Sequence, residues 1–307
     1  MRILVVGAGA VGGYFGGRLQ EAGRDVSFLV HSQQAEKLRA HGLRILSPFG
    51  DATVRPRLVL AHEISGEYDL ILLCVKAYSL DAAMNDFARA VGTSTMILPL
   101  LNGMRHIDLL ANRFGDSNVI GGVCFVVAEM DKDNRILQLT KIQELVYGER
   151  GGNTSARMET LNQTMQGAKF EAKISQNIEQ EMWEKWVMLS SLGAATCLLR
   201  GNIGEIAAVT GGAGVARGIL DECSAIAAAC GHAPSDAFLT RAEKTMTAPG
   251  STLTSSMYRD LMKKGRVEVD QILGDLLNRG RKLGLATPLV EAAYVNLRIY
   301  EARLAGK

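Results

Sequence analysis

The sequence GAGAVG occupies residues 7–12, directly after the apolar run Ile3–Val6 and directly before a helical pattern that includes Phe15 and Leu19. Its residues are Gly7, Ala8, Gly9, Ala10, Val11 and Gly12. Glycine at the first two positions permits a tight turn and the close approach of a pyrophosphate, and the third glycine lets the helix pack on the strand. Glycine-rich turns also end ordinary strands. The strand, turn and helix context at the start of the chain favours a dinucleotide-binding turn.

Further short apolar runs follow at the spacing of a parallel sheet that is covered by helices on both faces. These runs are Val26–Val30, Leu70–Val75, Met96–Leu100 and Val119–Val127. They predict a doubly wound α/β Rossmann domain with a mostly parallel sheet. Two shorter segments, Ile136–Thr140 and Glu144–Gly148, are expected to pair antiparallel with each other and close the edge of that sheet.

The second part of the chain has helical periodicity throughout. The expected helices are Asn177–Leu199, Gly211–Cys230, Ser235–Thr247, Thr252–Lys264, Val269–Leu283 and Pro288–Leu304. The stretch after the turn Gly151–Asn153 is helix-compatible and is assigned to the first domain. We therefore predict a Rossmann domain over residues 1–175 and an all-α domain over residues 176–307.

Composition excludes several classes of protein. A length of 307 residues suits two domains, and 47% hydrophobic with 21% charged residues is the balance of a globular protein. The net charge of +2, without a basic stripe, argues against nucleic-acid binding. No apolar run is long enough for a membrane span. The apolar helical domain is compatible with a homodimer.

The cysteines show no metal or disulfide spacing. They are Cys74, Cys124, Cys197, Cys223 and Cys230, an odd number without a CxxC pair. This pattern argues against a disulfide framework and against a zinc site, so no metal is expected. Reduced, mostly buried thiols predict a cytoplasmic protein.

The end of the second expected strand bears on the choice of cofactor. An NAD enzyme commonly has Asp or Glu there for the ribose hydroxyls, but this chain has Val30-His31-Ser32-Gln33. His31, Ser32 and Lys37 can donate hydrogen bonds to a 2′-phosphate, which favours NADP over NAD. The alternative is that His31 is a solvated loop histidine.

Reduction of a ketone needs a proton donor aimed at the carbonyl oxygen and polar groups for the rest of the substrate. Lys76 ends the strand Leu70–Val75 at the carboxyl edge of the sheet, where ligands of such folds bind, although it could be a solvated loop lysine. Asn102 follows the strand Met96–Leu100 at the same edge, where it can bind a ligand or only form an Asx turn.

Three residues of the helical half are further candidates. Lys185 lies between Trp183 and Trp186, where a lysine usually covers apolar surface with its stem; if that position faces the ligand, partial desolvation would suit it to donate a proton. Glu268 lies near a helix start, where a carboxylate can simply complement the helix dipole. Ser256, taken alone, is a serine on a helix surface.

Together these segments resemble the ketopantoate reductase (2-dehydropantoate 2-reductase) family from end to end. The matching stretches are GAGAVGGYFGGRL at 7–19, VKAY at 75–78, LNGM at 101–104, EMWEKW at 181–186, SSMYRDLMKKGRVEVDQILG at 255–274 and GLATP at 284–288. The resemblance implies NADPH-dependent reduction of ketopantoate to pantoate, in the pathway to pantothenate and coenzyme A. It also implies a helical domain like the C-terminal domain of 6-phosphogluconate dehydrogenase.

The resemblance also assigns roles to residues. Lys185 would protonate the carbonyl oxygen of the substrate. Glu268 would hydrogen-bond the substrate hydroxyl and help to orient Lys185, and Ser256 would hold the carboxylate. Asn102 and Lys76 would line the space for cofactor and substrate.

Four positions depart from the family pattern. Leu189 and Gly193 stand where the family often has Asn, four and eight residues after the catalytic lysine. Leu253 replaces another frequent Asn, and His31 replaces the usual arginine for the 2′-phosphate. Because polar pockets discriminate strongly between substrates, these changes suggest a related, more apolar 2-keto acid as an alternative substrate.

Two other functions stay open at this point. The chain could be an opine or hydroxyacid dehydrogenase of the wider group that joins a Rossmann domain to a helical one. The missing asparagines would also suit a non-catalytic NADPH-binding sensor, although a sensor has no need of the proton donor Lys185.

Overall fold

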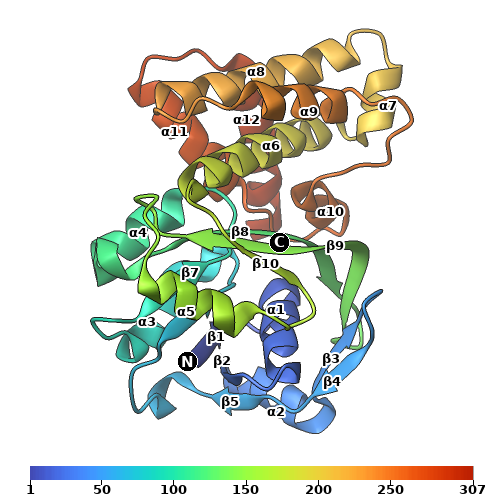
Figure 1. Ribbon diagram of the computed structural model, residues 1–307. Helices are drawn as coiled ribbons and strands as arrows, with labels where there is room; N and C mark the ends of the chain where they lie inside the picture. Colours follow the sequence, from blue (N-terminus) through green and yellow to red (C-terminus); the bar gives the residue numbers. More distant parts are fainter. Residues whose placement is uncertain (307) are drawn as a thin grey trace. The chain divides into compact units, whose positions relative to one another are not determined.

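The computed structural model describes residues 1–306 and divides into two compact units (Figure 1). The first unit comprises residues 1–101 and 106–179. The second comprises residues 102–105 and the chain from Gln180 onward. The main division therefore falls between Glu179 and Gln180. The boundary predicted from the sequence, at residue 175, lies a few residues earlier.

A parallel sheet of five strands forms the centre of the first unit, in the order β5-β2-β1-β6-β7. Its strands are β1 (Arg2–Val6), β2 (Asp25–Leu29), β5 (Arg57–Val59), β6 (Leu70–Leu73) and β7 (Met96–Pro99). The connecting segments contain the helices α1 (Ala10–Glu21), α2 (Ser32–His41) and α3 (Leu80–Phe87), and α4 (Arg105–Phe114) follows β7. The expected doubly wound α/β domain is thus confirmed. The strand order reverses between β1 and β6, and the carboxyl edge at such a reversal is where ligands of these folds bind.

The segments after β7 form a second sheet and correct the sequence-based expectation. Val119 makes one parallel bridge to Ile97, and the chain then leaves the first sheet as β8 (Gly121–Met130). β8 pairs antiparallel with β9 (Ile136–Gly148), which is one continuous strand where the sequence predicts two strands paired with each other. The reason is that residues 141–143 contain no turn-forming residue, whereas the turn lies at 131–134, where the Asp131 carboxylate accepts the backbone N–H of Asp133.

Short strands that the sequence does not reveal complete this second sheet. They are β3 (Leu43–Leu46), β4 (Ala52–Val54) and β10 (Glu171–Ile174). β3 and β10 both pair parallel with β9, and β4 pairs antiparallel with β3. Segments of three or four residues carry too little periodicity to be distinguished from loops.

Helix α1 lies between the two sheets, and its glycines make this possible. A Cβ atom at Gly16 would lie 2.7 Å from Val5 Cγ2 and 2.8 Å from Phe28 Cζ on the first sheet. A Cβ atom at Gly17 would lie 2.8 Å from Ile45 Cδ1 on the second sheet. The glycines of GGYFGG therefore allow both sheets to pack directly on the helix backbone. This packing role is additional to that of the phosphate-binding turn.

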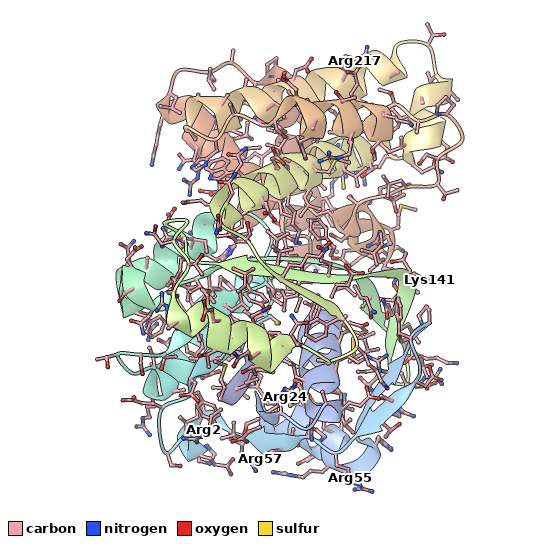
Figure 2. All side chains as sticks on the ribbon, in the orientation of Figure 1. Arg2, Arg24, Arg55, Arg57, Lys141 and Arg217 are labelled. Carbon is pink, nitrogen blue, oxygen red and sulfur yellow. The ribbon has the colours of Figure 1, made fainter. Side chains whose placement is uncertain are left out.

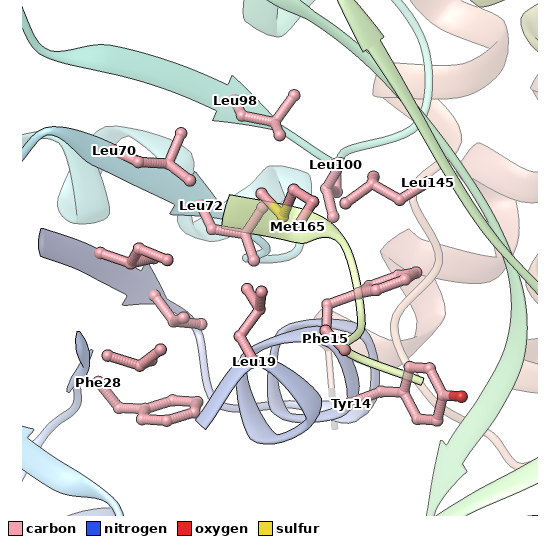
Figure 3. Close-up of a cluster of buried hydrophobic side chains, with 14 of the residues drawn as sticks. Tyr14, Phe15, Leu19, Phe28, Leu70, Leu72, Leu98, Leu100, Leu145 and Met165 are labelled. Atoms are coloured by element: carbon pink, nitrogen blue, oxygen red, sulfur yellow. The ribbon is translucent and has the colours of Figure 1, made fainter. Parts of the chain in front are cut away.

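A single apolar cluster fills the space around α1 (Figure 3). Phe15 and Leu19 lie on α1 among leucines of the parallel strands, such as Leu72 and Leu98. Met165, at the end of helix α5 (Ala156–Met165), closes the cluster, and Phe170 meets Phe15 edge to face at 5.0 Å. This packing fastens α1 to the parallel sheet.

Cations at the opposite edge of the parallel sheet are used for structure. Arg2 and Arg57 are the first residues of β1 and β5, so they lie at the amino edge, away from the glycine turn (Figure 2). Arg57 forms an exposed ion pair of 2.8 Å with Asp25, and the Arg2 guanidinium lies over the Tyr68 ring. These arginines are therefore remote from the edge where a ligand would bind.

The second unit contains only helices among its described residues, as the sequence predicts. They are α6 (Ile178–Leu199), α7 (Ile203–Ala208), α8 (Gly212–Ala229), α9 (Asp236–Met246), α10 (Ser256–Met262), α11 (Asp275–Lys282) and α12 (Pro288–Ala305). Helix α8 contacts α7, α9, α11 and α12. No helix within residues 1–306 has both the length and the apolar character that a bilayer span requires.

Helix α7 is absent from the expected helices, and two others differ from the expected ones. α10 begins at Ser256 rather than at Thr252, because the Ser255 side chain caps the helix by accepting the N–H of Tyr258 at 2.9 Å. The segment expected as one helix over Val269–Leu283 starts with a π-helical turn, Asp270–Gly274, before α11. Such turns are rare and frequently occur at functional sites.

Candidate active site

Two glycines of the turn after β1 are required by the fold itself. Gly7 has a φ of +98°, and a Cβ atom there would lie 3.0 Å from the backbone carbon and oxygen of Cys74. A Cβ atom at Gly12 would lie only 2.1 Å from the Gly7 carbonyl oxygen and 2.8 Å from Cys74 Cβ. Both positions therefore exclude a side chain whether or not a ligand binds.

Gly9 is different, because nothing in the folded chain requires glycine there. Its φ of −84° is open to any residue, and a Cβ atom would find no heavy atom within 4 Å. Gly9 is the N-cap of α1, where no side chain caps the helix and the first turn has no acidic residue. An open backbone surface at a helix N-terminus fits the pyrophosphate of a dinucleotide, which needs close approach and N–H donors.

The start of α2 is tied to this turn. The Gln34 side chain donates a hydrogen bond of 3.1 Å to the Ala8 carbonyl. His31 is the N-cap of α2 and is exposed, Ser32 is its first residue, and the first turn of α2 contains no acidic residue. The structure thus places His31 at the end of the second parallel strand, as the sequence predicts from its position, with a helix N-terminus of suitable polarity for an anion.

Lys76 lies three residues beyond the end of β6, next to the glycine turn. It is exposed, and its carbonyl accepts the Ser79 N–H at 2.9 Å in a short 3-10 turn. Between Lys76 and β6, Cys74 supports the backbone of Gly7, and burial raises the pKa of the Cys74 thiol well above its usual value. The thiol is therefore neutral at physiological pH and adds no negative charge beside the turn.

Lys185 lies on α6 in a turn that its neighbours hold firmly. The side chain of Lys185 is half-buried, whereas Trp183 and Trp186 are buried with ring centroids 5.0 Å apart. The Arg279 guanidinium lies 5.7 Å from the centroid of each ring. Two packed indoles fix the backbone on both sides of the lysine, which restricts where its ammonium can reach.

Glu268 is connected to the same turn of α6 through the π-helical segment. Glu268 is 8% exposed, and its carbonyl accepts the Ile272 N–H at 3.0 Å. The Ile272 carbonyl in turn accepts two side-chain hydrogen bonds from α6, from Trp186 Nε1 at 2.9 Å and from Ser190 Oγ at 3.2 Å. The segment that carries Glu268 is thus fastened to the helix turn that carries Lys185.

Ser256 lies in a segment that packs on α6 closer to the C-terminal end of that helix than Lys185. It is half-buried at the start of α10, next to Ser255, whose hydroxyl shares a hydrogen bond of 2.9 Å with Thr196 Oγ1. A Cβ atom at Gly193 would lie 2.4 Å from Met257 Cε, so the Met257 thioether packs on the α6 backbone at this glycine. The start of α10 therefore lies against the α6 segment that follows Lys185 by two to three turns.

Asn102 is half-buried in a turn that belongs to the second unit. Its carbonyl accepts a hydrogen bond of 3.0 Å from the Gln271 side chain, and Gly103 has a φ of +83°. Gly103 takes the left-handed position that glycine adopts without strain. Asn102 is also attached to the π-helical turn that follows Glu268.

The candidates therefore form two groups. In the first unit, Gly7 to Gly12, His31 and Lys76 lie at the carboxyl edge of the parallel sheet. In the second, Lys185, Glu268, Ser256 and Asn102 lie on segments that contact either α6 or the π-helical turn.

Sequence reasoning missed Trp186, Ser190 and Gln271 as residues that join these segments. Buried polar positions in an apolar helical pattern were the available signal for Ser190 and Gln271.

Known protein families match both halves of the chain. A family model described as "Ketopantoate reductase PanE/ApbA" matches residues 3–152, and one described as "Ketopantoate reductase PanE/ApbA C terminal" matches residues 177–301. The chain is 35% identical over 302 residues to an uncharacterized oxidoreductase of Bacillus subtilis, covering 98% of this chain and 99% of that protein.

Two further matches carry a more specific description. The 2-dehydropantoate 2-reductase of Mesorhizobium japonicum is 26% identical over 321 residues, covering 97% of each chain. The crystal structure of a PanE/ApbA family ketopantoate reductase from Ralstonia eutropha superposes with a TM-score of 0.89 at 25% identity, covering 99% of this chain and 100% of that one.

Proposed function

The chain belongs to the ketopantoate reductase family of oxidoreductases, and on that premise we propose that it reduces a 2-keto acid to a 2-hydroxy acid with NADPH. The first candidate substrate is 2-dehydropantoate. One observation carries the proposal: the segments with Glu268, Ser256 and Asn102 are all joined to α6 or to the π-helical turn bound to it. This attachment of the segments supports the proposal that a proton donor and three polar groups act on one small molecule.

The proposed chemistry assigns a separate task to each residue. When bound, the nicotinamide cofactor supplies the hydride for the carbonyl carbon. Lys185 holds a proton on Nζ and donates it to the carbonyl oxygen, while its positive charge stabilises the negative charge that develops there. The Ser256 hydroxyl binds the carboxylate. The Glu268 carboxylate accepts a hydrogen bond from the new hydroxyl and orients the Lys185 ammonium.

The cofactor side of the proposal uses the first unit. The open backbone at Gly9 binds the pyrophosphate, and Lys76, at the same edge of the parallel sheet, contacts the bound cofactor. The hydrogen bond from the Gln34 side chain to the Ala8 carbonyl holds the glycine turn against the start of α2. These residues bind and orient the cofactor and take no part in moving protons.

A substrate panel tests the proposed reaction. We expect the purified protein to oxidise NADPH, followed by its absorbance, with 2-dehydropantoate and to produce the 2-hydroxy acid. The panel should include 2-keto acids with branched, linear and aromatic side chains, as well as pyruvate. Tight NADPH binding without turnover of any 2-keto acid would favour the sensor function and overturn the reductase.

One observation favours a substrate more apolar than 2-dehydropantoate. Leu189 and Gly193 follow Lys185 by four and eight residues on the same face of α6, and the Met257 thioether occupies the space beside Gly193. The surface next to the lysine therefore offers no amide to a substrate hydroxyl. If this surface lines the pocket, kcat/KM in the panel will be higher for an apolar branched 2-keto acid than for 2-dehydropantoate.

NADPH preference is a separate prediction. His31 and Ser32 begin a helix that has no acidic residue in its first turn, so a 2′-phosphate would meet hydrogen-bond donors and a positive dipole end. We expect NADPH to bind at least about 10-fold more tightly than NADH, in line with one or two hydrogen bonds to a charged group. Competition titration measures the ratio.

The role of His31 is tested with a matched variant. His31→Ala should lower the NADPH to NADH affinity ratio by about 10-fold, because one hydrogen bond to a charged group contributes about 1.5 kcal/mol. His41→Ala, an exposed histidine at the other end of α2, should leave the ratio unchanged. Preferred binding of NADH by the unaltered protein would refute the assignment.

A further inference from the structure

Gln271 is a buried polar residue for which the proposed chemistry has no direct use. It lies inside the π-helical turn, three residues after Glu268, and only 6% of its surface is exposed. A buried amide is costly unless it makes hydrogen bonds, so its place in this turn calls for a specific partner. Its side-chain Nε2 donates a hydrogen bond of 3.0 Å to the carbonyl of Asn102, 169 residues away in the sequence.

The backbones of the two segments also touch at this point. A Cβ atom at Gly103 would lie 2.8 Å from the Gln271 carbonyl oxygen and 3.4 Å from its Nε2 atom. Because Gly103, with a φ of +83°, has no side chain, the π-helical turn can pack directly on the backbone of the Asn102 turn. Backbone contact and side-chain hydrogen bond together leave the Asn102 turn little freedom to move relative to Gln271.

The π-helical turn is itself fixed on its other side. Its Ile272 carbonyl accepts hydrogen bonds from Trp186 and Ser190 on α6, and its Ile272 N–H donates to the Glu268 carbonyl. Gln271 therefore stands between two attachments, with Asn102 on one side and the Glu268 and Lys185 segments on the other. The hydrogen bond from the Gln271 side chain to the Asn102 carbonyl joins the two.

From this arrangement we infer that Gln271 is a positioning residue, which holds Asn102 at a fixed position relative to Glu268 and Lys185. This inference rests on the proposed function, because it assumes that these three residues act on one substrate. Gln271 touches neither the reacting atoms nor the cofactor in this role. Its effect comes from geometry, since displacement of a polar group by about 1 Å can slow a reaction by about 100-fold.

Replacement of Gln271 by methionine tests the inference. Methionine has a similar length but no donor, so Gln271→Met should lower kcat by about 10-fold to 100-fold while NADPH affinity changes by less than about 3-fold. Gln138→Met is the matched control: Gln138 is also 6% exposed and donates to a backbone carbonyl, that of Ile142, within the first unit. The control should lose comparable thermal stability and keep its kcat.

Gln271→Glu gives a pH signature that a loss of packing would not produce. A protonated carboxyl can donate to the Asn102 carbonyl, whereas an ionised one offers only acceptors. Burial raises the pKa of a carboxyl, which brings this titration into the accessible pH range. The kcat of Gln271→Glu relative to the unaltered enzyme should therefore rise as the pH falls.

Two kinetic outcomes would overturn the inference. One is equal kcat for Gln271→Met and Gln138→Met, and the other is a ratio for Gln271→Glu that is flat or rises with pH. Amide hydrogen exchange in residues 103–105 adds a readout that needs no turnover, and Gln271→Met should accelerate it. An inactive unaltered protein would refute the proposed function, whereas unaltered exchange in Gln271→Met would refute the attachment itself.

Discussion

Replacement of Lys185 by alanine should lower kcat by about 100-fold to 10,000-fold, the usual contribution of a positioned general acid with its charge. NADPH affinity should change by less than about 2-fold, because the lysine acts on the transition state and not on the cofactor. The difference between the two effects identifies a catalytic residue. Steady-state kinetics and equilibrium titration of the same preparations measure both.

Two further variants make this result specific. Lys185→Arg keeps the positive charge but is a poor proton donor, since the guanidinium pKa lies far above the physiological range, so most of the kcat loss should persist. Lys244→Ala removes an exposed lysine of α9 in the same unit and should leave kcat unchanged. Equal losses of kcat and NADPH affinity in Lys185→Ala, or no loss, would contradict the assignment.

Replacement of Gly9 by alanine should impair cofactor binding without loss of stability, whereas replacement of Gly12 by alanine should destabilise the fold. Gly9→Ala places a Cβ atom in open space, so the melting temperature should not fall, yet the atom stands where the backbone must approach a pyrophosphate. We expect NADPH affinity to fall by about 100-fold, equivalent to about 2.7 kcal/mol. Thermal unfolding of the free protein and cofactor titration measure the two properties separately.

Gly12→Ala should damage the fold itself. Its Cβ atom would lie 2.1 Å from the Gly7 carbonyl oxygen, and backbone atoms cannot yield as a flexible side chain can. We expect the free energy of unfolding to fall by about 3 kcal/mol or more. Gly214→Ala, in open space on α8, is the control that should affect neither property adversely. If Gly9→Ala unfolds like Gly12→Ala, or binds NADPH normally, the cofactor role of Gly9 is wrong.

The comparison of Gly9 with Gly12 also shows what a motif can and cannot reveal. The spacing GxGxxG predicts a turn with three special glycines, but it does not say which of them the protein needs for folding. Only the positions of Cys74 and the Gly7 carbonyl separate a glycine required by packing from one left open for a ligand. The same holds for Gly17, whose role depends on a second sheet that local periodicity did not reveal.

Local sequence patterns determined the parallel sheet, the glycine turn, the helical second half and the family to which the chain belongs, because each depends on residues close together in the chain. The second sheet, the π-helical turn and the Gln271 to Asn102 hydrogen bond depend on partners that are far apart in sequence. Backbone periodicity is encoded by neighbours, whereas the partner of a buried polar group is decided only when the chain has packed. Tertiary structure alone therefore decided which segments are joined to α6, the helix that carries Lys185.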